Sequence, residues 1–343
     1  MIEIDGSHGE GGGQLVRNAA ALAAVTGKAV RVANLRAKRP NPGLAAQHVT
    51  ALQALAAVSG ARIEGLRPGS RQIVVTPGTL AGGTHRFDVG TAGSVTLVLQ
   101  ACLPAALMAP APTDLTLIGG TDVKWSPPLD YLRFVFLPLL ARMGGRVEVE
   151  EVRRGYYPRG GGQVRVKVTP SSGFRPLVVE PPGNLRRIRG IAHAANLPPH
   201  VAQRMKQSAA RQFVAIAETK IEERSLGNAQ AMGPGGAIVL WTEHENTVLG
   251  ADALAEKGEP AEKVGQAAGE ELLSDLKAHA SLDVHASDQV LIYAALAEGE
   301  SRFSAREVSG HALTTMWLLE AFLGVKFETA QVGGRVQFRV MPQ

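Results

Sequence analysis

The chain has 343 residues, of which 45 % are apolar and 20 % charged, a composition that predicts a globular protein with a large core and excludes a disordered chain. The net charge of +5 permits a polyanionic partner without demanding one. Cys102, the single cysteine, excludes an internal disulfide and a cysteine-based zinc site, and its apolar surroundings predict a buried, inert thiol.

The sequence also indicates where the protein resides. No apolar run approaches the roughly 18 residues that a membrane-spanning helix needs. The first residues, Met1-Ile-Glu-Ile-Asp5, have neither the basic nor the apolar part of a signal peptide. We therefore expect a cytoplasmic protein with no membrane partner.

Two glycine-rich runs interrupt the chain. The first is Gly9-Glu-Gly-Gly-Gly-Gln14, and the second is Gly160-Gly-Gly162, which follows Arg159. Three successive glycines lack Cβ atoms, so the backbone can adopt positive φ and another group can approach it closely. The carboxylate of Glu10 and the basic Arg159 point to phosphate and metal chemistry. The alternative is that both runs are tight turns between strands.

Basic residues gather beside both runs. Arg31, Arg36, Lys38 and Arg39 fall close together after the first run, while Arg153, Arg154 and Arg159 flank the second. Each cluster is either a solvated basic face or part of a site for an anion.

The order of predicted elements recurs three times. Apolar spacing predicts helices at 44–58, 129–140 and 313–322, and each is followed by two alternating segments typical of half-buried strands. A further helix and strand precede each of them, with helices at 14–25, 94–108 and 287–296 and strands at 29–32, 114–118 and 302–306. The unit is therefore βαβαββ, about 80 residues long, and its recurrence indicates a repeat architecture.

The spacing of the repeats predicts an insertion. The second helices begin near residues 44, 129 and 312, so the later gap exceeds the earlier one by about 100 residues, enough for a separate domain. We place this domain at 181–277, with strands at 186–195 and 237–243 and helices at 200–217 and 261–279. The remaining repeats occupy 1–180 and 278–343.

Several motifs together resemble those of the RNA 3′-terminal phosphate cyclase family. The stretch Arg154-Gly-x-x-Pro158-x-Gly160-Gly-Gly-x-Val164 is similar to the signature of that family. The other motifs follow in the family's order, namely Gly9–Gln14, Arg36-x-x-Arg39, Gln47-His48, Gly90-x-Ala-Gly-Ser94, Asp288-Gln289 and Gly310-His311. The resemblance implies an α+β fold of three βαβαββ repeats, like the C-terminal domain of translation initiation factor three, with a smaller thioredoxin-like α/β domain inserted.

The resemblance also implies an activity. Members of the family convert an RNA 3′-phosphate into a 2′,3′-cyclic phosphate, using ATP and a divalent cation, Mg²⁺ or Mn²⁺. The implied steps are adenylation of an enzyme histidine, transfer of AMP to the RNA 3′-phosphate, and attack by the 2′-hydroxyl with loss of AMP. The expected partner is therefore RNA with a 3′-phosphate end, and a homodimer is one expected assembly.

Roles for individual residues follow from the same resemblance. His311 is expected to be the nucleophile, and its place at the start of the last helix favours a neutral imidazole. Glu10 is expected to bind the metal. The set expected to bind phosphates or the RNA end is Arg17, Arg36, Arg39, Gln47 and His48. The set expected to bind ATP or AMP is Gln100, Pro127, His285, Asp288 and Gln289, with Pro127 and His285 on either side of adenine. His285 stands where bacterial relatives carry tyrosine.

Two other classes stay open on the sequence alone. Enolpyruvyl transferases are built from a similar repeat, but they have six repeats and no comparable insertion. A ribosome-assembly branch of the same family lacks the nucleophilic histidine, which His311 argues against. The chain has no Walker loop to hold ATP.

Overall fold

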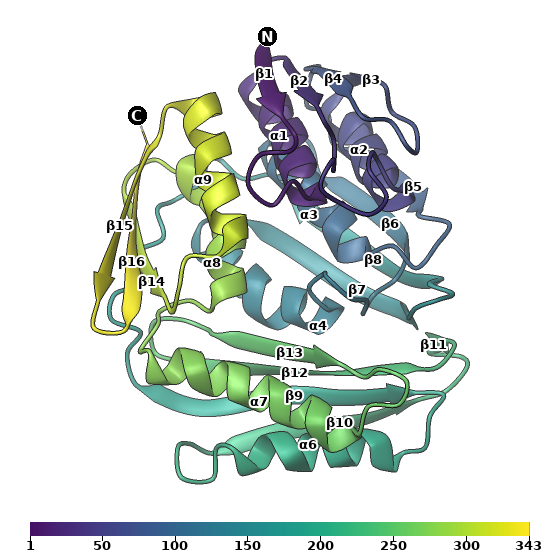
Figure 1. The fold of residues 1–343 in the computed structure, drawn as a ribbon, viewed down its shortest axis with the longest axis vertical. Coiled ribbons are helices and arrows are strands. Elements are labelled where there is room, and N and C mark those ends of the chain that lie inside the picture. The colour runs from purple at the N-terminus through teal and green to yellow at the C-terminus, as the bar shows by residue number, and fades with distance from the viewer. Residues whose placement is uncertain (343) are drawn as a thin grey trace.

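The computed structural model describes residues 1–342 (Figure 1). Its helices are α1 (Gly13–Thr26), α2 (Ala46–Ser59), α3 (Val95–Met108), α4 (Leu129–Tyr131), the π-helical η1 (Leu132–Phe136), α5 (Leu137–Arg142), α6 (His200–Arg211), α7 (Ala261–Lys277), α8 (Val284–Ala295) and α9 (Gly310–Leu323). Among these residues, no helix combines the length and apolar character that crossing a membrane requires.

The strands form four sheets. They are β1 (Ile2–Asp5), β2 (Val30–Ala33), β3 (Arg62–Glu64), β4 (Ile73–Thr76), β5 (Gly83–Asp88), β6 (Thr113–Gly119), β7 (Arg146–Gly155), β8 (Gly162–Thr169), β9 (Leu185–Ala195), β10 (Thr219–Leu226), β11 (Ala231–Met232), β12 (Gly235–His244), β13 (Gly250–Leu254), β14 (Ser301–Ala305), β15 (Lys326–Val332) and β16 (Arg335–Met341). Mixed sheets covered by helices confirm the predicted α+β class.

Three of the sheets share one strand order. The first is β1-β2-β4-β3, and the second is β5-β6-β8-β7 with the short β11 added beside β7. In both, the first strand is parallel to the second, and the next two pairs are antiparallel, while the added β11 is parallel to β7. The third sheet, β14-β16-β15, is antiparallel throughout.

A short segment completes the third sheet in the same way. Val178 pairs in parallel with Arg302 of β14, the Val179 N–H donates to the Arg302 carbonyl at 2.8 Å, and the Arg302 N–H donates to the Leu177 carbonyl at 2.9 Å. This leading segment lies far ahead of β14 in the sequence. The chain therefore starts its third sheet, leaves it for residues 185–277, and then returns.

Residues 185–277 form a second unit, in the lower part of Figure 1. Its sheet has the order β10-β9-β12-β13, and α6 and α7 pack against each other and against this sheet. A separate hydrophobic cluster lies within the unit and includes Ile188, Met205, Phe213, Leu240 and Leu272. The sheet also contacts the main unit, because Trp241 of β12 stacks on Phe134 of η1 with ring centroids 4.6 Å apart.

Some predicted elements differ in detail from the observed ones. The helix expected at 129–140 is divided into α4, η1 and α5, and Leu137 N–H donates to the Leu132 carbonyl, five residues back. Pro138 has no N–H to donate to Phe134, so the regular α-helical ladder cannot continue there. The thiol of Cys102 is fully buried in α3, as predicted, and burial raises its pKa.

Arg154 of the second glycine-rich stretch is a buried structural residue. Its guanidinium is 1 % exposed and donates to Asp122 at 2.9 and 3.0 Å, to Asp130 at 2.7 Å and to Glu151 at 2.7 Å. His193 of β9 lies 3.9 Å from both Asp122 and Asp130. This buried cluster joins the main unit to residues 185–277, so Arg154 does not belong to a solvated basic face.

Asp283 makes a second link between the two units. It begins α8, where Oδ1 accepts from the Ala286 N–H at 2.9 Å and from the Tyr131 hydroxyl at 2.6 Å. Its other oxygen accepts from the Gly250 N–H of β13 at 2.9 Å. One buried carboxylate thus holds α8, α4 and the second unit together.

We predict that Asp283→Ala destabilises the protein by at least about 3 kcal/mol, because three buried donors lose their acceptor and each costs about 1–3 kcal/mol. Urea unfolding measures this change. Asp114→Ala removes an exposed carboxylate from β6 and should stay within about 0.5 kcal/mol of the wild type. A cost below about 1 kcal/mol for Asp283→Ala would contradict this role.

Candidate functional site

Contacts between side chains link the first turns of five helices. Gly12 and Gly13 begin α1, Gln47 and His48 lie in the first turn of α2, and Ser94 precedes α3. Residues 285–289 lie at the start of α8, and Gly310 and His311 start α9. Helix N-termini present unpaired N–H groups and positive dipole ends, so their convergence favours an anion.

His311 contacts the first glycine-rich run. Its Nδ1 is 3.1 Å from Oε2 of Glu10, and the same oxygen is 3.7 Å from a guanidinium nitrogen of Arg39. The His311 side chain is 43 % exposed, so it remains accessible. A carboxylate beside Nδ1 favours the tautomer with the hydrogen on that nitrogen, which leaves the lone pair of Nε2 free.

Side chains of the site closely approach glycines at the starts of α1 and α9. A Cβ at Gly310 would lie 2.6 Å from Oε1 of Glu10, and a Cβ at Gly12 would lie 3.1 Å from Arg39. A Cβ at Gly13 would collide with Nε2 of His48. Gly310 therefore lets the Glu10 carboxylate approach the start of α9, and Gly12 and Gly13 let two basic side chains approach the start of α1.

His48 and Arg17 are buried beside the start of α1. The Ala45 N–H donates to Nδ1 of His48 at 3.1 Å, so Nε2 carries the hydrogen and faces Gly13. Burial lowers the pKa of His48 to about 3, and the charges of Arg17 and Arg36 contribute. His48 is thus a neutral hydrogen-bond donor near neutral pH.

Arg17 is a buried cation that lacks a counterion. Its side chain is 7 % exposed, and no hydrogen bond or ion pair within residues 1–342 satisfies its guanidinium. Burial lowers its pKa to about 10, which still leaves it charged at pH 7. A buried, unpaired guanidinium beside a helix N-terminus is ready to bind an anion.

The basic cluster after the first run separates into different roles. Arg36 adopts a positive φ of 52° and donates through Nη1 to the carbonyls of Asn41 at 2.9 Å and Gly43 at 2.7 Å, which fixes its own loop. Lys38 donates to the Gly9 carbonyl at 3.0 Å and so ties that loop to the glycine run. Arg31 lies on β2, where it donates to Gln72 at 2.9 Å.

Gln47 connects the site to the loop before α3. Its side-chain oxygen accepts from the Ser94 N–H at 3.1 Å. The Ser94 hydroxyl caps α3 and is 2.7 Å from the hydroxyl of Thr96, which donates to the Pro127 carbonyl at 2.8 Å. Pro127 is thereby held against the first turn of α3.

The remaining predicted residues cluster on α3 and α8. Gln100 donates to Gln289 at 2.6 Å, and Gln289 donates to the backbone carbonyl of His285 at 3.1 Å. The side chain of His285 is exposed. Asp288 is buried and accepts from the Ser309 hydroxyl at 2.6 Å. Burial raises the pKa of Asp288 to about 7.

Sequence reasoning missed Ser309. Its hydroxyl accepts from the Ala312 N–H at 2.9 Å, which caps α9 and sets the orientation of the turn that carries His311. Its bond to Asp288 joins α9 to α8. A serine directly before a predicted helix is a recognisable N-cap signal, so the sequence contained the information.

A divalent cation fits this site only with help from a ligand. Residues 1–342 contain no group of three or more His, Cys, Asp or Glu side chains arranged to hold a metal ion. Glu10 supplies one half-exposed carboxylate. Mg²⁺ is commonly bound by one or two carboxylates together with phosphate oxygens, so Glu10 fits a cation that arrives with a nucleotide.

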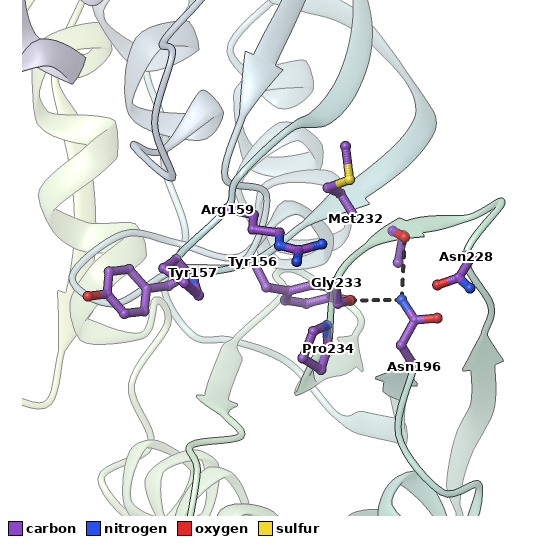
Figure 2. Close-up of a pocket in the computed structure, with 10 residues that line it drawn as sticks. Tyr156, Tyr157, Arg159, Asn196, Asn228, Met232, Gly233 and Pro234 are labelled. Atoms are coloured by element: carbon purple, nitrogen blue, oxygen red, sulfur yellow. Dashed lines mark hydrogen bonds between the residues drawn. The ribbon is translucent and has the colours of Figure 1, made fainter.

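The second glycine-rich stretch lies away from these side chains. Gly160 packs on the backbone of Thr91 and Ala92, on the loop that ends at Ser94. Figure 2 shows the cavity beside it, about 430 Å³ in volume. Its lining comprises Tyr156, Tyr157, Pro158, Arg159, Asn196, Asn228, Ala231, Met232, Gly233 and Pro234. We call it the Arg159 pocket.

Known proteins resemble the chain over nearly its whole length. The family model described as RNA 3′-terminal phosphate cyclase matches residues 8–329. A solved EPSP synthase from Acinetobacter baumannii covers 95 % of the chain, which spans 62 % of that protein, but a TM-score of 0.28 at 10 % identity makes the likeness too weak to bear on fold or function.

Curated relatives named RNA 3′-terminal phosphate cyclase are much closer. The protein from Nitrosospira multiformis is 50 % identical over 100 % of this chain and 97 % of its own. The relative from Pyrobaculum neutrophilum is 46 % identical, covering 97 % and 96 %, and that from Pyrococcus furiosus is 43 % identical, covering 99 % of both. The chain is therefore an enzyme that belongs to the RNA 3′-terminal phosphate cyclase family.

Proposed function

We propose that this enzyme converts an RNA 3′-terminal phosphate into a 2′,3′-cyclic phosphodiester at the expense of ATP, through a covalent His311–AMP intermediate and an RNA 3′-adenylate. The names of its relatives support the cyclisation. The observation that carries the mechanism is the contact of Glu10 with Nδ1 of His311 at the start of α9.

The chemistry balances over three steps. Nε2 of His311 attacks the α-phosphorus of ATP, an N–P bond forms and pyrophosphate leaves. An oxygen of the RNA 3′-phosphate then attacks that phosphorus, the N–P bond breaks, and a mixed anhydride with AMP results. Finally the 2′-hydroxyl loses its proton, attacks the 3′-phosphorus and expels AMP, with the high effective concentration of an intramolecular reaction.

The side chains of the site orient the nucleophile, bind phosphates or shape the loops around them. Glu10 orients His311 and would, with the phosphates of ATP, hold Mg²⁺ or Mn²⁺. Such a cation neutralises charge on the phosphates when it is bound. Arg17, Arg39 and neutral His48 supply donors for the incoming phosphates, and Arg36 shapes the loop that carries Arg39. Gln47 positions the Ser94 loop.

The adenine of ATP is proposed to lie between Pro127 and His285. Pro127 is fixed by Thr96, and His285 is exposed in the first turn of α8. Gln100, Gln289 and Asp288 form the polar floor between α3 and α8. An imidazole offers less stacking area than a phenol ring, so His285 should hold adenine more weakly than tyrosine would.

We also propose that the fold consists of three βαβαββ repeats with an inserted thioredoxin-like domain, in the divisions 1–180, 181–277 and 278–343. The common strand order of three sheets and the order β10-β9-β12-β13 support this interpretation. The segment at 177–179 then opens the third repeat before the insertion. Homodimer assembly and a cytoplasmic location stay predictions from the sequence.

We predict that His311→Ala still binds ATP but forms no adenylate, because alanine offers no nucleophile. The test incubates both proteins with α-labelled ATP and a divalent cation. The wild-type adduct should be labile in acid and stable in alkali, as a phosphoramidate is. Labelling of the alanine variant would remove His311 from the mechanism, and an adduct cleaved by hydroxylamine would point to a carboxylate instead.

Arg39→Ala and Arg36→Ala should differ in their effect on stability. Arg39 is 43 % exposed and 3.7 Å from Glu10, so its loss should slow cyclisation at least about tenfold with little change in Tm. Arg36→Ala removes two backbone contacts and should lower both cyclisation and Tm. Arg31→Ala is the matched control and should change neither quantity. Wild-type cyclisation by Arg39→Ala would refute its role.

The pH dependence of self-adenylation should report His311. Burial lowers its pKa below the ordinary 6.5, and nearby positive charges add to this effect while Glu10 opposes it. Since only the unprotonated ring is nucleophilic, the rate should rise with pH, with a midpoint below 6.5, and be constant above pH 7. Asp288→Asn removes a nearby carboxyl group whose pKa burial raises to about 7. A midpoint above 6.5 in both proteins would contradict the prediction.

A further inference from the structure

We propose that the Arg159 pocket binds a nucleotide of the RNA strand several positions upstream of the reacting 3′ end, with Arg159 on a backbone phosphate and Tyr157 against a base. This inference rests on the proposed function, because it assigns a second contact surface to the same RNA. It gives a role to the second glycine-rich stretch, which takes no part in the chemistry at His311.

The charge of the pocket favours an anion. Arg159 is the only ionisable side chain in its lining apart from the tyrosines, and no carboxylate lines it. Within the described part of the chain, Arg159 is exposed and makes no ion pair, and its stem runs beside Gly233, with Cδ 3.7 Å from the position of a Cβ there. Arg153 lies close by, because its guanidinium is 3.4 Å from the sulfur of Met232.

Two asparagines in the lining of the pocket have different roles. Asn196 donates to the carbonyls of Ala231 and Gly233, at 3.4 and 2.9 Å, so its side chain holds the wall in place (Figure 2). Asn228 is exposed, and none of the hydrogen bonds found in residues 1–342 involves its side chain. A free amide and an unpaired guanidinium match the polar edge and the phosphate of a nucleotide.

Tyr157 supplies the stacking surface. It is 79 % exposed, which is unusual for so large a ring. Figure 2 shows that it projects from the rim of the pocket, away from Asn196 and Asn228. An exposed aromatic beside an unpaired cation is the combination that binds single-stranded RNA without regard to sequence.

A short loop connects the neighbour of Arg159 in the sequence to Gln47 of the candidate site. Gly160 packs on Thr91 and Ala92, while Gln47 holds the N–H of Ser94. The four residues 91–94 span at most about 14 Å when fully extended. A stacked strand advances about 3.4 Å per nucleotide, so about four nucleotides cover this span. A stacked dinucleotide covers only about 7 Å, half of that greatest span.

The test compares 3′-phosphorylated RNAs of two and eight nucleotides. We expect wild-type enzyme to have the lower KM for the longer RNA. Tyr157→Ala and Arg159→Ala should each raise that KM about tenfold, leave kcat unchanged, and leave the KM of the dinucleotide unchanged. Arg159→Ala should also reduce the slope of log KM against log salt by about 0.7. Tyr157→Phe should behave as wild type.

Arg211→Ala is the matched control, since it removes the same charge from the exposed end of α6 and should change no KM. Self-adenylation with α-labelled ATP verifies that each variant is folded. A photoreactive base four nucleotides from the 3′ end should cross-link to the turn at 156–159 in the wild type.

The outcomes separate the two proposals. If wild-type enzyme neither self-adenylates nor cyclises either RNA, the proposed function fails. If it cyclises both with the same KM, if the variants keep the length preference, or if the cross-link falls outside the pocket, the inference about the Arg159 pocket is overturned while the proposed function stands.

Discussion

The buried guanidinium of Arg154 is the interaction that holds together β7, α4 and the loop before α4, where the main unit meets His193 of residues 185–277. It lies at the end of β7 and donates hydrogen bonds to carboxylates from the loop before α4, from α4 and from β7 itself. Removing it would leave uncompensated buried carboxylates at a cost of about 3–5 kcal/mol. The same contacts fix the backbone just before the turn at 156–159 on one side and the loop that leads to Pro127 on the other. The loop that carries Pro127 and the Arg159 pocket therefore share one anchor.

The sequence predicted the regular parts of this structure well. Apolar periodicity located α1, α3 and α9 because each is a long helix with a broad buried face. It could not reveal the role of Arg154, since the acidic partners are scattered along the chain. Nor did spacing alone bring Glu10 to His311, because 300 residues separate them, and only the family resemblance suggested that they share a site. The segment at 177–179 was too short to recognise as a strand.

Three arginines of the candidate site lie in different surroundings and have different contacts. Arg17, Arg36 and Arg39 all follow the first glycine run. Arg17 is buried without a partner, Arg36 is bound to its own loop, and Arg39 is half exposed beside Glu10. Composition and spacing do not distinguish these three arginines from one another. What distinguishes them is which acceptors the fold places around each guanidinium, and this becomes visible only when the loops are seen in three dimensions.

The divided third sheet has a consequence for how the protein forms during synthesis. The segment at 177–179 leaves the ribosome more than a hundred residues before β14, with which it pairs. Domains generally fold in the order in which they emerge, so the first two sheets and residues 185–277 can form while this segment waits unpaired. Closing such a long loop is slow. His311 lies in α9, so the proposed nucleophile joins the chain only after the waiting segment and the whole of residues 185–277 have been made.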